Sequence, residues 1–147
     1  MTICILILTA ALGAAILSDL RDCTVCDLCW WVGLVACVPL LGFRIAAHGL
    51  LSVDWLGTGL FLLVQQLVMS RAYGRADCHA YSICALGLAG LGLELRDFTA
   101  MMFVSFLLLV GIQFLRKNIT KSGKLRTPVA FVPYIGAGFA LAALLGT

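Results

Sequence analysis

The sequence predicts an all-α fold: a polytopic membrane protein with six transmembrane helices. Of its 147 residues, 63% are hydrophobic and only 12% are charged, which is about half the roughly 25% typical of soluble domains. The mean hydropathy is +1.09. Apolar stretches alternate with short polar connections. An isolated strand in lipid would leave its backbone groups unpaired, so each stretch is expected to be a helix.

The length and charge narrow the organisation further. The chain suits a single domain, residues 1–147, with no room for a soluble enzyme domain beside the membrane part. A net charge of +3 is small and scattered, so no nucleic-acid partner is expected. The partner that the composition implies is the lipid bilayer.

Six apolar segments define the expected helices. They are residues 3–18, 28–47, 51–70, 80–93, 98–115 and 129–145. Crossing a bilayer takes about 20 apolar residues, or about 17 for a short helix. The fourth segment is shorter, so we expect it to extend into the preceding loop or to lie partly within the protein. The first segment lacks the Lys or Arg that begins a signal peptide, so we expect it to be a retained helix.

The positive charges predict the orientation of these helices. Eight Lys and Arg residues fall in the first, third and fifth connections and two in the second and fourth. Five of the eight lie between the last two segments. The positive-inside rule then places the odd connections in the cytoplasm and both termini outside. We therefore expect a multi-pass protein of the inner (cytoplasmic) cell membrane.

Two of the seven acidic residues carry the functional prediction. Asp19 is expected to close the first helix and Asp77 to precede the fourth, both at the cytoplasmic face. They would meet if these two helices are neighbours. Two carboxyls in a partly dry site do not readily both ionise, so one can act on a water as base while the other protonates a leaving amine. On the residues alone, helix capping or pairing with Arg21 is an equally good interpretation.

Three segments resemble a known family, the type IV prepilin peptidases and preflagellin peptidases. The segment SDLRDCTVCD resembles the family's first signature, with Asp19 at the end of helix one and Arg21 after it. GRADCH is similar to the Gly-x-Gly-Asp-x-Lys signature and has Asp77 at the aspartate. TPVAFVPYIGAGFA is similar to the last-helix pattern of prolines and small residues. The departures are Cys26 and Asp27 for Pro-Asn, Ala76 for the second glycine and His79 for the lysine.

The resemblance implies an aspartic endopeptidase within the membrane, with Asp19 and Asp77 as the catalytic residues and no cofactor. Its implied substrate is a pilin-like precursor with a basic leader and an apolar helix, cleaved at the cytoplasmic face. Larger members carry an insertion with paired cysteines and also methylate the product. This chain has no such insertion between its first two helices, so it resembles the compact peptidase-only type and no methyltransferase activity is expected.

Four further residues are predicted to bind the substrate. Asp22 and Asp27 would attract the cations of the leader, each contact contributing about 1 kcal/mol; capping or pairing with Arg is equally consistent with their positions. Gly74 and His79 belong to the GRADCH segment. The small residues there would leave space for an unwound stretch of substrate.

The alternative class is a small transporter, or a thiol-redox or metal-binding membrane protein that uses Cys23, Cys26 and Cys29. Their C-x-x-C-x-x-C spacing suits zinc, an iron–sulfur cluster or thiol exchange. However, Cys29 already begins an apolar segment and no fourth ligand is near in sequence, so no metal is expected. A transporter would need its acids near mid-membrane. Replacing the three cysteines with Ser would stop a redox protein and spare a peptidase.

Overall fold

The computed structural model describes residues 2–72, 74–120 and 130–146, with side chains in the fifth helix up to residue 115. The described part is helical and has six α-helices and two short 3-10 helices, and no strand occurs within it. The predicted all-α class and the number of helices are therefore confirmed for these residues. In chain order the elements are α1 (Thr2–Asp22), α2 (Asp27–His48), η1 (Leu50–Ser52), α3 (Trp55–Leu67), η2 (Met69–Arg71), α4 (Arg75–Leu91), α5 (Leu95–Thr120) and α6 (Val132–Gly146).

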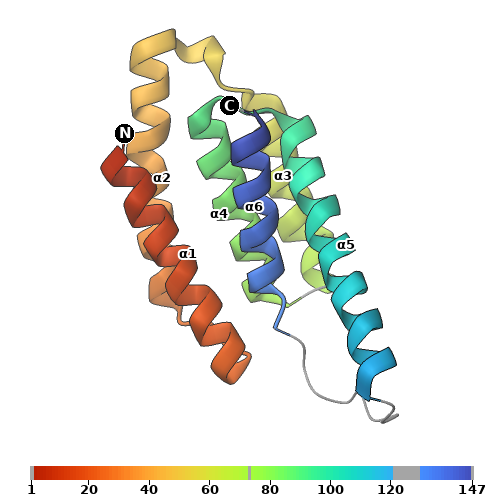
Figure 1. Ribbon diagram of the computed structural model, residues 1–147. Coiled ribbons are helices and arrows are strands. Elements are labelled where there is room, and N and C mark those ends of the chain that lie inside the picture. The colour runs from red at the N-terminus through yellow and green to blue at the C-terminus, as the bar shows by residue number, and fades with distance from the viewer. Residues whose placement is uncertain (1, 73, 121–129, 147) are drawn as a thin grey trace.

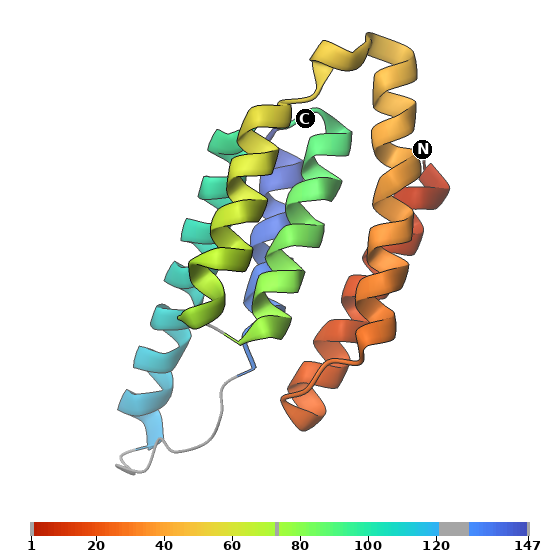
Figure 2. The ribbon, with the colours of Figure 1, turned by 180° about the vertical axis from the view of Figure 1, so that it is seen from behind.

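Among the described residues, three helices are long and apolar enough to cross a membrane: α1, α2 and the Leu95–Leu115 part of α5, while α6 is a shorter apolar helix. These features are consistent with a membrane protein. Figure 1 shows α1 ending and α4 and α6 beginning at the same end of the bundle. Both labelled chain termini lie toward the opposite end, and the reverse view in Figure 2 agrees.

Helix α4 is the centre of the bundle. It contacts each of the other five α-helices, and most of its residues are buried. It also begins at Arg75, five residues before the apolar segment. Both expectations for the short fourth segment are thus confirmed: it extends into the preceding loop and it lies within the protein.

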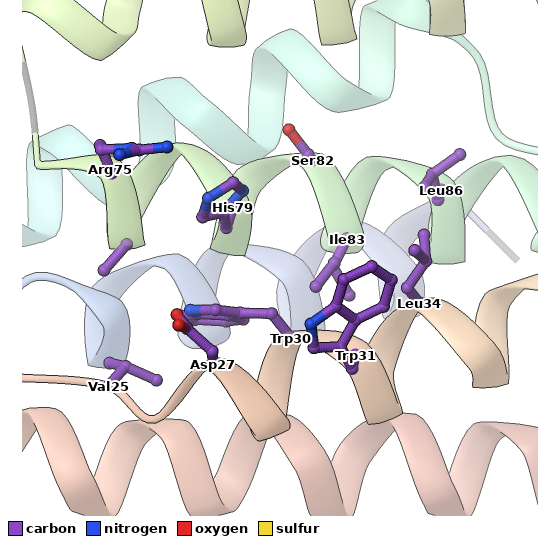
Figure 3. Close-up of a pocket in the computed structure, with 11 residues that line it drawn as sticks. Val25, Asp27, Trp30, Trp31, Leu34, Arg75, His79, Ser82, Ile83 and Leu86 are labelled. Atoms are coloured by element: carbon purple, nitrogen blue, oxygen red, sulfur yellow. The ribbon is translucent and has the colours of Figure 1, made fainter.

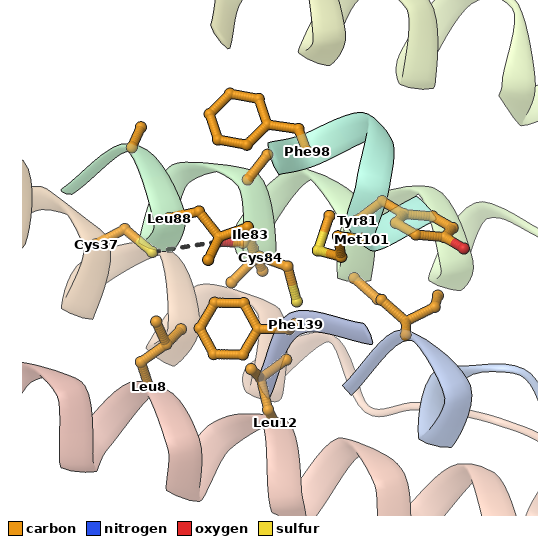
Figure 4. Close-up of a cluster of buried hydrophobic side chains, with 14 of the residues drawn as sticks. Leu8, Leu12, Cys37, Tyr81, Ile83, Cys84, Leu88, Phe98, Met101 and Phe139 are labelled. Atoms are coloured by element: carbon orange, nitrogen blue, oxygen red, sulfur yellow. Dashed lines mark hydrogen bonds between the residues drawn. The ribbon is translucent and has the colours of Figure 1, made fainter. Parts of the chain in front are cut away.

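Glycines allow α1 to approach α4 and α6 closely. A Cβ atom added to Gly87 of α4 would lie 2.7 Å from Leu8 Cδ2, and one added to Gly136 of α6 would lie 2.7 Å from Ile16 Cδ1. Leu8 also belongs to the buried cluster shown in Figure 4, together with Phe139 and other side chains of the bundle centre. Close helix approach through small residues is the usual packing device within membranes. It brings the end of α1 beside the starts of α4 and α6.

The third segment is shorter than predicted, because an acid caps it. The side chain of Asp54 accepts a hydrogen bond from Gly57 N at 2.8 Å, which starts α3 at Trp55 rather than at residue 51. Its other oxygen accepts from Leu95 N at 3.2 Å, at the start of α5. The last helix begins at Val132; the predicted start at residue 129 lies outside the described residues.

Candidate active site

Asp19 lies inside the bundle, one turn before the end of α1. The prediction that it closes the helix is wrong, because α1 continues to Asp22 and the backbone bond from Cys23 N to Asp19 O adds a further turn. The Asp19 side chain is only 7% exposed. Its Oδ2 accepts a buried hydrogen bond from Val132 N at 3.0 Å. The carboxyl of α1 is therefore held at the N-terminus of α6.

Asp77 lies in the first turn of α4. The prediction that it precedes the helix is also wrong: Gly74 is the N-cap and the helix begins at Arg75. Burial raises the pKa of Asp77 to about 6, and the negative charge of Asp19 adds to the rise, while a hydrogen bond from the Gly74 backbone opposes it. A carboxyl at the third helical position that reaches back to the N-cap backbone is a common capping arrangement.

The two predicted catalytic residues lie at the same end of the bundle. The charge of Asp19 acts on the pKa of Asp77, although 58 positions separate them, and α1 contacts α4 as the hypothesis required. Capping also occurs here, because Asp19 caps α6 and Asp77 caps its own helix. Pairing of Asp19 with Arg21 does not occur: Arg21 Nε lies 4.0 Å from Asp22 Oδ1, and both of these side chains are exposed.

The other predicted substrate residues are divided between two places. Asp22 lies on the exposed end of α1. Gly74 caps α4 beside Asp77. Asp27, the first residue of α2, and His79 of α4 instead line a groove between these two helices. The segment GRADCHA is helical from its second residue, so it does not form the open space expected for an unwound substrate.

The groove between α2 and α4 has a volume of about 510 Å³. Figure 3 shows its side chains. Its lining residues are Val25, Asp27, Trp30, Trp31, Leu34, Arg75, Ala76, His79, Ser82, Ile83 and Leu86. Neither Asp19 nor Asp77 is among them. The groove and the two carboxyls therefore occupy different sides of α4.

The cysteines of CTVCDLC do not gather into a site. Cys23 and Cys26 are exposed, and Cys29 is half-buried at the start of α2. Cys78 is completely buried in α4. Within the part of the chain that the structure describes, no three His, Cys, Asp or Glu side chains are arranged to hold a metal ion.

Sequence reasoning missed the backbone N–H of Val132. Its signal was present: Pro133 follows directly, and proline is favoured in the first turn of a helix. This marks the start of α6, but it does not show which side chain meets the exposed N–H groups there. Only the packing of α1 against α6 supplies that partner.

Comparisons with protein-family models, with curated proteins and with solved structures found no significant match. The functional argument therefore depends on the residues and on their geometry.

Proposed function

We propose that the protein is a membrane-embedded aspartic endopeptidase that cleaves the basic leader from type IV prepilin-like precursors at the cytoplasmic membrane face. The observation that carries the proposal is the position of Asp19 and Asp77 at the same end of the bundle, where burial and, to a smaller extent, the charge of Asp19 raise the pKa of Asp77. Aspartic peptidases need such a pair, because hydrolysis requires a base and an acid at the same peptide bond.

The surroundings of the two carboxyls favour different roles. Burial raises the pKa of Asp19, but the hydrogen bond from Val132 N–H to Asp19 Oδ2 and the positive end of the α6 dipole oppose the rise. Asp19 is therefore the proposed base. Asp77, with its pKa raised to about 6, takes up a proton more readily than an ordinary Asp and is the proposed acid.

Hydrolysis then follows without a metal or a covalent intermediate. Asp19 removes a proton from a water as its oxygen bonds to the scissile carbonyl carbon. Asp77 donates a hydrogen bond to the carbonyl oxygen and its proton neutralises the developing charge. When the C–N bond breaks, the leaving amine takes up the proton that Asp19 received, and a hydroxyl of the tetrahedral intermediate returns a proton to Asp77, so both carboxyls regain their starting states.

The position of the site suits a precursor of this kind. The site lies at the end of the bundle where α1 ends and α4 and α6 begin (Figure 1). Helix α5 also ends there (Figure 1), and the Lys and Arg residues in the sequence between α5 and α6 predict, by the positive-inside rule, that this end faces the cytoplasm. Six membrane spans, outward termini and location in the inner membrane are part of this proposal. So is the absence of methyltransferase activity, because only residues 23–26 connect α1 to α2.

The test is cleavage of a co-expressed precursor that has a basic leader followed by one apolar helix. Asp19→Asn and Asp77→Asn should each reduce cleavage on the order of 100-fold or more, the usual contribution of a general acid or base. Glu94→Gln is the matched control, because this acid is exposed and lies just before α5, away from the two carboxyls, and it should cleave at nearly the parental rate. Full cleavage by either of the first two variants, with normal amounts in the membrane, would refute the proposal.

A further inference from the structure

The groove between α2 and α4 has a polar end and an apolar end. Figure 3 shows Asp27, Arg75 and His79 together near the starts of the two helices. Toward the other end the lining is Leu34 and Leu86, with Trp31 beside them. Charge at the membrane boundary followed by apolar surface along the helices matches the layout of an amphiphile.

The polar end carries charges of both signs. Asp27 is acidic, and Trp30, three residues later in α2, lies on the same face of the helix and also lines the groove. Arg75 is always cationic, and His79 stands next to Trp30, with the two ring centroids 6.5 Å apart. A carboxylate beside an aromatic face binds an ammonium group, and Arg with an imidazole N–H binds phosphate. These groups together suit a zwitterion that contains an amine and a phosphate.

The groove has room for a headgroup and part of one acyl chain. From Arg75 to Leu86 it spans twelve residues of α4, which is about 16 Å, or half the hydrocarbon thickness of a bilayer. Its volume of about 510 Å³ lies within the roughly 300–1,000 Å³ of small-molecule sites. A whole phospholipid is larger than this volume, so the rest of the lipid would stay in the bilayer.

The wall of the groove also suits an acyl chain, which makes no hydrogen bonds. The one hydroxyl in the apolar part, Ser82 Oγ, already donates to Cys78 O at 2.8 Å and accepts from Gln66 Nε2 at 3.0 Å. Ile83 and Leu86 flank it. Trp31 is 65% exposed on a helix long enough to cross a membrane, so the groove is open on the side where lipid would lie.

We propose that this groove binds one phospholipid with an amine-bearing zwitterionic headgroup: the phosphate at Arg75 and His79, the amine at Asp27, and an acyl chain along Trp31 and Leu34. The site is independent of the proposed peptidase function. It assigns Asp27 and His79 to a lipid rather than to the leader of a precursor. A basic leader would meet Arg75 here, and the two carboxyls do not line the groove.

The test is binding of phosphatidylethanolamine to the full chain in mild detergent, measured by native mass spectrometry. Phosphatidylethanolamine should bind more tightly than phosphatidylglycerol, which has the phosphate but no amine. Arg75→Ala and Asp27→Asn should each weaken it about tenfold, as expected for one charge-assisted hydrogen bond. The matched controls Arg96→Ala and Asp97→Asn carry the same changes at the start of α5, at the other end of the bundle, and should bind normally.

Three results would overturn the inference. One is equal weakening by the groove and control variants. Another is tighter binding of phosphatidylglycerol together with a gain of affinity in Asp27→Asn, which would show that the site selects anionic lipids. The third is displacement of the lipid by a precursor peptide, which would make the groove a peptide site. Melting temperatures of all variants should stay near that of the parent protein, which excludes unfolding as the cause of lost binding.

Discussion

Replacing Asp77 with Asn should make the protein more stable near neutral pH while abolishing cleavage. Burial and the charge of Asp19 raise the pKa of Asp77 from 3.8 to about 6. Between these two values the folded state binds the proton more tightly than the unfolded state does. The free energy of unfolding therefore falls as the pH rises through this window. Asn cannot ionise, so the variant does not lose stability as the pH rises.

The size of the effect follows from the same shift. A rise of about 2 pKa units corresponds to about 3 kcal/mol at 1.36 kcal/mol per unit. Because Asp77 is only partly buried, solvent screening reduces this to about 1–3 kcal/mol. The gain should be full at pH 7 to 8 and should vanish near pH 4, where the wild-type carboxyl is protonated in the folded protein.

The assay is thermal unfolding in mild detergent, monitored by tryptophan fluorescence at several pH values from 4 to 8. Asp22→Asn is the matched control, because this exposed acid should leave the melting temperature unchanged throughout. The reasoning is refuted if Asp77→Asn melts below the wild type at pH 7. It is also refuted if the gain is the same at pH 4 as at pH 7, since the gain would then not come from ionisation.

Three further predictions concern the two carboxyls and the packing of α1 against α4. Asp19→Ala should lower the free energy of unfolding by about 1–3 kcal/mol in thermal denaturation, because it leaves the buried Val132 N–H without its acceptor. Asp19→Asn keeps an acceptor oxygen and should lower the free energy of unfolding by less. Gly87→Ala should lower the free energy of unfolding by about 1–3 kcal/mol and slow cleavage, because the added methyl pushes Leu8 and α1 away from α4. Gly13→Ala is the control, because an added Cβ there meets nothing within 4 Å, and it should change neither stability nor cleavage. Cleavage measured against pH should follow a bell whose alkaline limb lies near pH 6, because the acid must keep its proton; a rate that rises steadily to pH 8 would contradict these roles.

Apolar segments alone predicted the number of helices, because each helix buries an apolar face and polar residues mark its ends. Helix ends depended on contacts that the local sequence does not contain. Asp54 caps α3 and also holds Leu95 N, 41 positions away. Asp77 was expected outside α4, although a carboxyl beside an N-cap glycine can equally form part of the first turn, as it does here.

The candidate site could be predicted in part. Asp19 and Asp77 were identified from their positions at the ends of apolar segments, and the structure has both at the same end of the bundle. The bond between Asp19 and Val132 spans 113 positions and follows only from packing. The same is true of Asp27 and His79, whose helices turn them toward the groove rather than toward the carboxyls.

The central claim is that the carboxyls of Asp19 and Asp77 share one site. The most direct test is to measure the titration midpoint of Asp77 from its infrared carboxyl stretch, in the wild type and in Asp19→Asn. The wild-type midpoint should lie near pH 6, and it should fall in the variant, because the repelling charge has gone. A midpoint that is the same in both proteins would show that the two carboxyls do not interact.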